Sequence, residues 1–294
     1  MMPLPSPKQT WVHAVDNKQM LLEALYNDAI TAIETDILMG RCAVLTPDSN
    51  QPTPTNDNDR VMIPIMAHPP NRTSDLIMTD FLGLVSSAYM EDYDDNALGG
   101  NKIIRKIIKL DFKEIATVEP TLKALVALQA KTTESSIVFL NADILPCPGN
   151  RGNVTTIDST EFMETSLKYI CKCRDTTRMA FSLGFKTNWT DPNDGYTMED
   201  LRAMSDLIYH YHQLVELKIG VVMALNARQL AKSLSSPSSS SSLDEMLRQF
   251  PQLQILAWTG KGEPAIPKSI LQEIQDHFDE LQMVHRIGYD CHVS

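Results

Sequence analysis

A regular alternation of short β-prone segments with amphipathic helical segments is the feature that most constrains the fold. About eight strands are expected, beginning near Trp11, Ile33, Ile107, Ile137, Met179, Gly220, Leu253 and Val284. Alternation of this kind favours parallel strands joined by right-handed crossovers. About eight such units in 294 residues predict an α/β fold, a single (β/α)8 TIM barrel of residues 1–294.

A doubly wound open sheet is the main alternative to the barrel. Such a sheet usually carries a glycine-rich phosphate-binding turn directly after its first strand. In this chain the first predicted strand is followed by Asp16, Asn17 and Lys18, so that fingerprint is absent. The barrel is therefore the favoured fold.

Two stretches interrupt the alternation, and we expect both to be flexible inserts. Residues 46–60 are rich in Pro, Asn, Asp and Thr, and they lie between two further predicted strands at 42–45 and 61–67. Polar segments of this composition bury too little apolar surface to become ordered. Residues 233–242 are a serine-rich stretch of low complexity, which predicts a flexible loop before a short helix from Leu243 to Phe250.

The composition excludes some classes of partner. The chain carries a net charge of −11, and an acidic chain is a poor general binder of the nucleic-acid backbone, so no extended nucleic-acid surface is expected. No apolar run approaches the roughly 18 residues of a transmembrane span. The first residues lack the apolar core of a signal peptide, and the five cysteines lack framework spacing. These features predict a cytoplasmic protein with free thiols.

Two carboxylates, Glu34 and Asp36, stand two residues apart in the second predicted strand. Residues with this spacing share one face of a strand, about 7 Å apart along it. Buried carboxylates repel each other unless a positive charge lies between them, and a hard divalent cation such as Mg²⁺ or Ca²⁺ takes oxygen ligands. The alternative is a solvent-facing edge strand with alternating polar residues.

In a (β/α)8 barrel the active site lies at the C-terminal ends of the strands. The polar and aromatic residues at these ends are His13, Glu34, Asp36, His68, Asp111, Lys113, Asn141, Asp143, Ser182, Asn226, Arg228, Trp258, Thr259, Tyr289 and Asp290. The first three strands and the excursion after the second bring together two histidines, three acids and a lysine. We interpret Glu34, Asp36 and Asp111 as ligands of Mg²⁺ or Ca²⁺, with Mn²⁺ as a further option.

The chemistry of these groups suits cleavage of a small phosphodiester. His13 and His68 are predicted to be acid and base, since the pKa of a free imidazole lies near the working pH. A cation and Lys113 would stabilise the phosphoryl oxygens. Alternatively the histidines are metal ligands, which would favour zinc or iron.

Three residues on later strands are further candidates for substrate binding. Asn141, Arg228 and Trp258 lie at or just after the ends of predicted strands. Capping of the next loop is the alternative role for Asn141, and packing is the alternative for Trp258.

Four motifs together resemble the menorin family: residues 11–15 (WVHAV), 33–38 (IETDIL), 64–76 (PIMAHPP and SDL) and 109–113 (KLDFK). That family resembles the phospholipase-C-like phosphodiesterases, which include glycerophosphodiester phosphodiesterases and sphingomyelinase D. The resemblance implies catalytic roles for His13 and His68, and an aromatic at the barrel mouth for Trp258. It also implies phosphate contact by Lys113 and Mg²⁺ or Ca²⁺ ligation by the three acids.

The chain departs from the glycerophosphodiesterase pattern after the first histidine, and it also lacks an obvious Glu-Asn-Thr segment. That type has Arg-Gly after the first histidine, whereas this chain has Ala14 and Val15, so substrate specificity does not carry over. A metal-dependent phosphodiesterase is the first hypothesis. An inactive barrel that binds a phospho-ligand or acts as a scaffold is the second, and a barrel metallohydrolase for esters or amides is the third.

Overall fold

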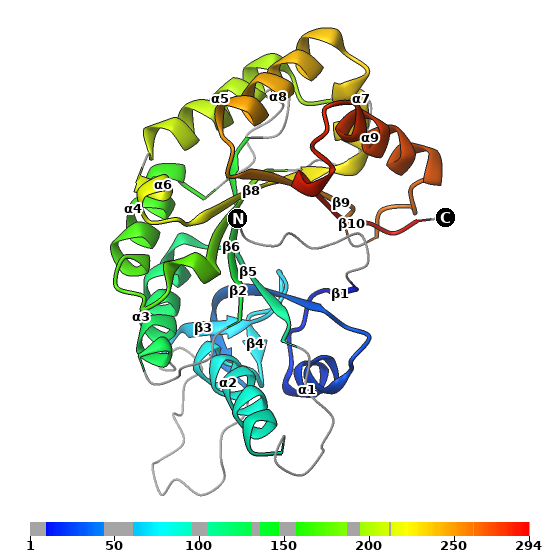
Figure 1. Ribbon diagram of the computed structural model, residues 1–294. Helices are drawn as coiled ribbons and strands as arrows, with labels where there is room; N and C mark the ends of the chain where they lie inside the picture. The colour runs from blue at the N-terminus through cyan, green and yellow to red at the C-terminus, as the bar shows by residue number, and fades with distance from the viewer. Residues whose placement is uncertain are drawn as a thin grey trace, which may run out of the picture. The chain divides into compact units, whose positions relative to one another are not determined.

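The computed structural model describes residues 10–43, 61–95, 105–130, 136–146, 157–186, 195–211, 213–260 and 262–293. The insert predicted at 46–60 lies outside the described residues. Within the described ranges strands and helices alternate along the chain, as the sequence indicates (Figure 1).

The first elements are β1 (Trp11–Val12), α1 (Lys18–Tyr26), β2 (Ala32–Cys42), β3 (Ile63–Met66), β4 (Thr73–Ser74), α2 (Met78–Asp95), β5 (Ile107–Phe112), the 3-10 helix η2 (Ile115–Thr117) and α3 (Val118–Gln129). The later elements are β6 (Val138–Leu145), α4 (Ser159–Ile170), η3 (Thr176–Arg178), β7 (Met179–Phe185), α5 (Met198–His210), α6 (Gln213–Glu216), β8 (Gly220–Asn226), α7 (Ala227–Leu234), α8 (Pro237–Gln249), β9 (Leu253–Trp258), α9 (Lys268–Glu280), η4 (Val284–Arg286) and β10 (Ile287–Asp290).

The principal strands follow one another in sequence order. The hydrogen-bonded path is β1-β2-β5-β6-β7-β8-β9-β10, and β3 and β4 pair with β2 beside this path. This is the strand order of a TIM-like α/β fold. The chain divides into two compact units, which are described separately below. The N-terminal unit is Thr10–Leu140 with Glu164–Asp175, and the C-terminal unit contains Asn141–Met163 and Thr176–Ser294.

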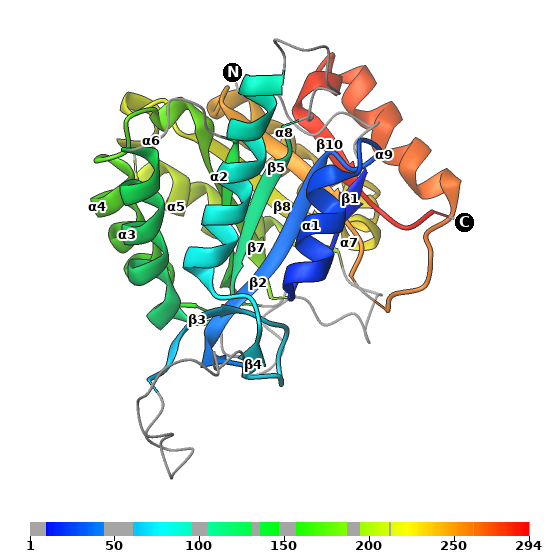
Figure 2. The same cartoon turned by 90° about the horizontal axis from the view of Figure 1, so that it is seen from below.

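In the N-terminal unit, β1 and β5 flank β2 and run parallel to it. Helices α1 and α2 lie against one face of these strands (Figure 2). All six residues of β5 are buried, including a lysine and an aspartate, as expected for a parallel strand that is covered on both faces.

Strand β2 is longer than the sequence predicts. A separate strand was expected at 42–45, of which residues 44 and 45 lie outside the described ranges. Cys42 instead belongs to β2, which runs without a break from Ala32 to Cys42. Its second half gains partners outside the parallel path, because β3 pairs with it antiparallel from Ile37 onwards and β4 pairs with its end. These additional partners explain why the strand continues past the parallel sheet.

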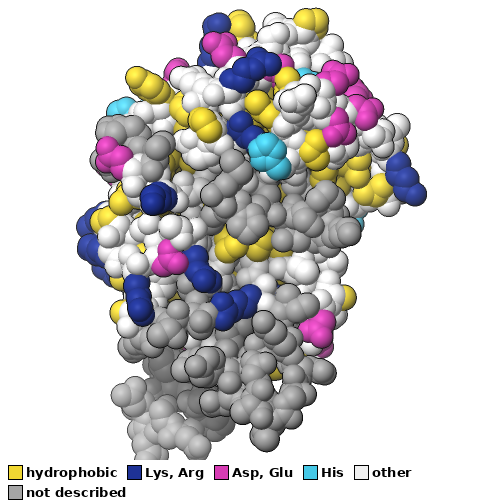
Figure 3. All heavy atoms as spheres, in the orientation of Figure 1, with side chains coloured by type: hydrophobic (Ala, Val, Ile, Leu, Met, Phe, Trp, Pro, Cys, Tyr) yellow, Lys and Arg dark blue, Asp and Glu magenta, His cyan; other side chains and the backbone are white. Residues whose placement is uncertain are grey.

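Lysines surround Tyr169 where the end of α4 meets α3 in the N-terminal unit. The hydroxyl of Tyr169 donates to Glu119 Oε1 at 2.5 Å. The ammonium groups of Lys172, Lys168 and Lys123 lie 4.8, 5.4 and 5.9 Å from the centre of the tyrosine ring. Figure 3 shows Lys and Arg side chains on this part of the surface. The tyrosine thus fastens the end of α4 to α3.

The C-terminal unit contains the parallel strands β7, β8, β9 and β10 in sequence order. Helix α5 packs with α8, and α7 packs with α9. Among the residues that the structure describes, no helix is both long and apolar enough to cross a membrane.

The serine-rich stretch 233–242 is helical except for Ser235 and Ser236, which join α7 to α8, so the prediction of a loop was wrong. Ser233 belongs to α7, and α8 begins at Pro237, a residue that favours the first turn of a helix. Ser239 is buried on the same side of α8 as Leu243 and Met246. The apolar face of the helix therefore extends back through the serines, and its packing orders a sequence that composition alone marks as a loop.

Candidate functional site

The pairing of β2 with β5 brings the three predicted metal-binding acids close together. Glu34 lies opposite Lys109 and Asp36 lies opposite Asp111 in the parallel register. Side chains at partner positions point to the same face of a sheet. One carboxylate oxygen from each of Glu34, Asp36 and Asp111 lies within 4.8 Å of the others. The three acids therefore form a compact cluster within the N-terminal unit, in which Asp36 and Asp111 are buried.

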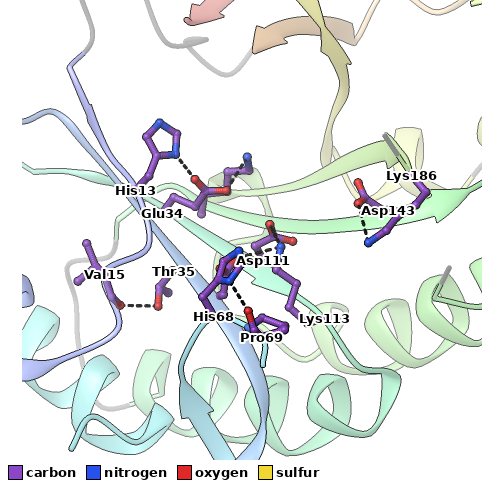
Figure 4. A network of polar contacts seen from close by, with 12 residues as sticks. His13, Val15, Glu34, Thr35, His68, Pro69, Asp111, Lys113, Asp143 and Lys186 are labelled. Carbon is purple, nitrogen blue, oxygen red and sulfur yellow. Dashed lines mark hydrogen bonds and ion pairs between the residues drawn. The ribbon is translucent and has the colours of Figure 1, made fainter. Parts of the chain in front are cut away.

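Two lysines neutralise part of this cluster. Lys113 Nζ lies 2.6 Å from Asp111 Oδ2 (Figure 4). The same atom lies 2.9 Å from Asp36 Oδ1. Lys109 Nζ lies 3.1 Å from Glu34 Oε1. The sequence interpretation included Lys113 but assigned no role to Lys109. The signal was present, because residues 109, 111 and 113 alternate and therefore share one face of an extended chain.

His13 follows β1 and contacts the cluster from the side of Glu34. Its Nδ1 hydrogen-bonds Glu34 Oε2. Ala14 has a φ of +51°, a left-handed conformation that is unfavourable by about 1–2 kcal/mol for an L-residue. Hydrogen bonds on both sides of Val15 hold this turn, since its N–H donates to Glu34 O at 3.1 Å and its carbonyl accepts from Thr35 Oγ1 at 2.7 Å. The strained residue therefore fixes the direction of His13.

His68 follows β3 and approaches from the side of Asp36. The N–H of Ala67 donates to Asp36 O at 3.1 Å, which anchors the end of β3 beside the acid. His68 Nδ1 lies 2.7 Å from Pro69 O, and Nε2 lies 3.8 Å from Asp36 Oδ2. A carbonyl can only accept, so Nδ1 carries the proton and Nε2 of a neutral ring is an acceptor. The side chain is 55% exposed and accessible to a ligand.

The pKa values of Glu34 and Asp36 are shifted in opposite directions. Burial acts to raise the pKa of Glu34, but Lys109 and the hydrogen bond from His13 outweigh burial and hold that pKa below its ordinary value. Burial raises the pKa of Asp36 to about 6; the Asp111 and Glu34 carboxylates add to this shift and Lys113 opposes it. A further positive charge close to Asp36 would lower its pKa and favour the ionised carboxylate.

The donor set fits a hard divalent cation. Glu34, Asp36 and Asp111 offer carboxylate oxygens, the ligands that Mg²⁺ and Ca²⁺ prefer. Three carboxylates pair with two lysine ammonium groups, so the lysines alone do not balance the negative charge of the cluster. These three residues could hold such a cation, with the histidines outside the ligand set.

The other predicted substrate-binding residues belong to the C-terminal unit. Asn141 is buried and its Oδ1 accepts from Ser182 Oγ at 2.6 Å. Arg228 Nη2 donates to Pro264 O at 2.6 Å and so holds the loop after β9. Trp258 is the partly buried last residue of β9. These contacts give Asn141 and Arg228 structural roles in their unit, and their roles in substrate binding stay predictions.

A second carboxylate–lysine pair lies at the ends of β6 and β7, within the C-terminal unit. Asp143 Oδ2 is 3.9 Å from Lys186 Nζ (Figure 4). A Cβ atom on Gly184 would lie only 2.8 Å from Asp143 Oδ1, so glycine is required for the aspartate to keep this position.

Comparison with known proteins covers nearly the whole chain. The family model described as the menorin N-terminal domain matches residues 7–290. The human protein FAM151B is 30% identical over 280 residues, which are 95% of this chain and 82% of the relative. The matched region includes every residue of the cluster on β2 and β5. The chain belongs to the menorin family, through its N-terminal domain.

Proposed function

We propose that this protein is a divalent-metal-dependent phosphodiesterase that uses His13 and His68 as acid and base. The observation that supports this function best is the placement of the imidazoles around the acids. His13 hydrogen-bonds Glu34, while His68 Nε2 lies 3.8 Å from Asp36. Proton donor and acceptor groups thus flank a cluster of acids and lysines that suits a phosphoryl group.

The hydrogen bonds of the two rings suggest different roles. The Nδ1–H of His68 donates to Pro69 O, and Nε2 of this exposed side chain is available to accept a proton from the attacking hydroxyl. His13 has the Glu34 carboxylate against Nδ1, and a neighbouring negative charge stabilises the protonated ring. We therefore assign His68 as the base and His13 as the acid that protonates the leaving oxygen.

The acids and Lys113 organise the phosphoryl group in this proposal. A cation held by Glu34, Asp36 and Asp111 would supply positive charge for the phosphoryl oxygens. Lys113, at the edge of the cluster and bonded to Asp36 and Asp111, adds a second positive charge on the same face. The attacking hydroxyl is water or a hydroxyl of the substrate, which would give an open or a cyclic phosphate.

The test is a panel of phosphodiesters followed by ³¹P NMR. The panel holds glycerophosphodiesters, lysophospholipids, cyclic nucleotides and oligonucleotides, each with Mg²⁺, Ca²⁺, Mn²⁺ or chelator. The proposal expects cleavage of at least one class that stops in chelator and returns with a divalent cation. Absence of cleavage with every substrate and metal would contradict it.

The assignment of acid and base has its own test. An aryl phosphodiester releases a phenolate that needs little protonation, so loss of the acid matters less for it. His13→Ala is expected to recover most of its turnover on the aryl substrate, whereas His68→Ala stays inactive on aryl and alkyl substrates. Equal behaviour of the two variants would contradict the assignment.

One observation favours a second candidate, a barrel that binds a phospho-ligand without cleaving it. The acids already have counter-charges from the chain, because Lys109 pairs with Glu34 and Lys113 pairs with Asp36 and Asp111. A site of this kind would bind a phosphodiester in chelator. Ligand binding in chelator without turnover in any metal would support this candidate over the enzyme.

A further inference from the structure

Lys109 stands at an unusual place for a lysine. It lies in the middle of β5, where all six residues are buried, and only 7% of its side chain is exposed. Burial of an ammonium group is costly unless the group is paired. The position therefore depends on a partner inside the N-terminal unit.

That partner is Glu34, and the ion pair occupies one of the two carboxylate oxygens of Glu34. Glu34 lies opposite Lys109 in the register of β2 and β5, and Lys109 Nζ is 3.1 Å from Glu34 Oε1. The other oxygen, Oε2, contacts His13. The Lys109 ammonium also lies 5.9 Å from the centre of the Trp11 ring. Both oxygens of Glu34 are thus engaged by groups of the chain itself.

The charges of the cluster show what Lys109 changes. The Glu34, Asp36 and Asp111 carboxylates carry three negative charges, and Lys109 and Lys113 carry two positive charges. With His13 protonated, as its role as the acid requires, and His68 neutral, these groups carry no net charge. Without Lys109 the cluster would hold one net negative charge, and it would lose a positive charge that repels a cation over a short distance in a buried site.

We propose that Lys109 is a built-in counter-charge that keeps the affinity of the three-acid cluster for a free divalent cation low. The cation then binds well only together with an anionic phosphoryl group, whose own negative charge restores the attraction. This inference rests on the proposed function. It names Lys109 as a positioning residue that makes binding of the cation depend on the anionic phosphoryl group.

The experiment is a calorimetric titration of the full chain with Mn²⁺, with and without dimethyl phosphate as the anionic probe. In the wild type, dimethyl phosphate is expected to tighten Mn²⁺ binding several-fold. Lys109→Met removes the charge and keeps most of the chain length, so Mn²⁺ alone is expected to bind about tenfold more tightly or better. Equal or weaker Mn²⁺ binding by folded Lys109→Met would overturn the inference.

Two lysine variants are matched controls. Lys109→Arg keeps the charge and is expected to bind Mn²⁺ like the wild type. Lys106→Met removes another buried lysine, whose ammonium donates to the carbonyls of Asn27 and Ile30 at 2.8 and 2.6 Å, and it is expected to leave Mn²⁺ affinity unchanged. A gain in affinity in Lys106→Met as large as in Lys109→Met would also overturn the inference.

A second pair of variants tests the same point if Lys109→Met does not fold. Glu34→Gln with Lys109→Met removes both charges and is compared with Glu34→Gln alone. The double variant is expected to bind Mn²⁺ several-fold more tightly, because only the repelling ammonium differs between them. No difference would overturn the inference. If neither the wild type nor any variant binds Mn²⁺, the proposed metal-dependent function itself is contradicted.

Discussion

Asp36 and Asp111 occupy partner positions on β2 and β5, and both carboxylates bind the same ammonium group. Lys113 Nζ lies 2.9 Å from the first and 2.6 Å from the second. One positive charge shared by two buried carboxylates leaves a deficit of positive charge. Because of this deficit, we expect protons and divalent cations to compete for the carboxylates of Asp36 and Asp111.

Divalent binding is predicted to weaken as the pH falls through about 6. Burial raises the pKa of Asp36 to about 6, so a proton competes with the cation for this carboxylate below that pH. The measurement is the dissociation constant of Mn²⁺ from pH 7.5 to pH 5. Asp36→Asn is expected to bind Mn²⁺ more weakly at pH 7.5 and to show a flatter pH dependence. An affinity of the wild type that does not change over this range would contradict the prediction.

Asp36→Asn is also predicted to stabilise the metal-free protein at pH 7. The folded state binds the Asp36 proton more tightly than the unfolded state, so ionisation of this group lowers the free energy of unfolding as pH rises from about 4 to 6. The free energy of unfolding of Asp36→Asn is expected to exceed that of the wild type by about 1–3 kcal/mol at pH 7, and this difference is expected to vanish below pH 4. Denaturant titrations in chelator measure it, with the exposed Asp206→Asn as the control. A less stable Asp36→Asn at pH 7 would argue against this.

Arg286→Met is predicted to destabilise the C-terminal unit strongly. The guanidinium of Arg286 is buried and donates to the carbonyls of Leu253, Leu247 and Phe250 at 2.5–2.8 Å. Its loss leaves buried acceptors without donors and is expected to cost about 3–5 kcal/mol of unfolding free energy. Arg248→Met, on the exposed side of α8, is the control for thermal unfolding. Equal melting temperatures for the two variants would refute the role of Arg286.

Ser240→Pro is predicted to destabilise the fold, because the serine-rich stretch is helical. The N–H of Ser240 donates to Ser236 O at 2.9 Å, and a proline removes this bond. The cost in a helix is about 3 kcal/mol. Ser240→Ala keeps the bond and serves as the control, with unfolding followed by circular dichroism. If the proline variant melts like the alanine variant, the stretch does not behave as a helix.

Much of the site could be predicted because strand periodicity is a local property. The spacing of Glu34 with Asp36, and of Asp111 with Lys113, places each pair on one face of an extended chain, and the structure brings them together. The order of strands and helices is likewise local, since it follows from apolar patterns along the chain.

The features that the sequence did not predict depend on contacts between residues that are distant in the chain. The ion pair of Lys109 with Glu34 depends on the register of β5 on β2, which spacing within one strand does not determine. The direction of His13 depends on a left-handed Ala14, and nothing about an alanine marks it for that conformation. The helix through Ser239 depends on packing of the residues that follow it, which overrides local composition.

The most direct test of the central claim is the turnover of an alkyl phosphodiester by His13→Ala and His68→Ala beside the wild type. Each variant is predicted to lose about 10²-fold or more in kcat, the usual contribution of a general acid or base, while Mn²⁺ binding and folding persist. His277→Ala, which loses the contact of α9 with Asp244 at 2.9 Å and the packing of the ring on Phe278, is predicted to keep its turnover. Full activity of folded His13→Ala and His68→Ala would contradict the account.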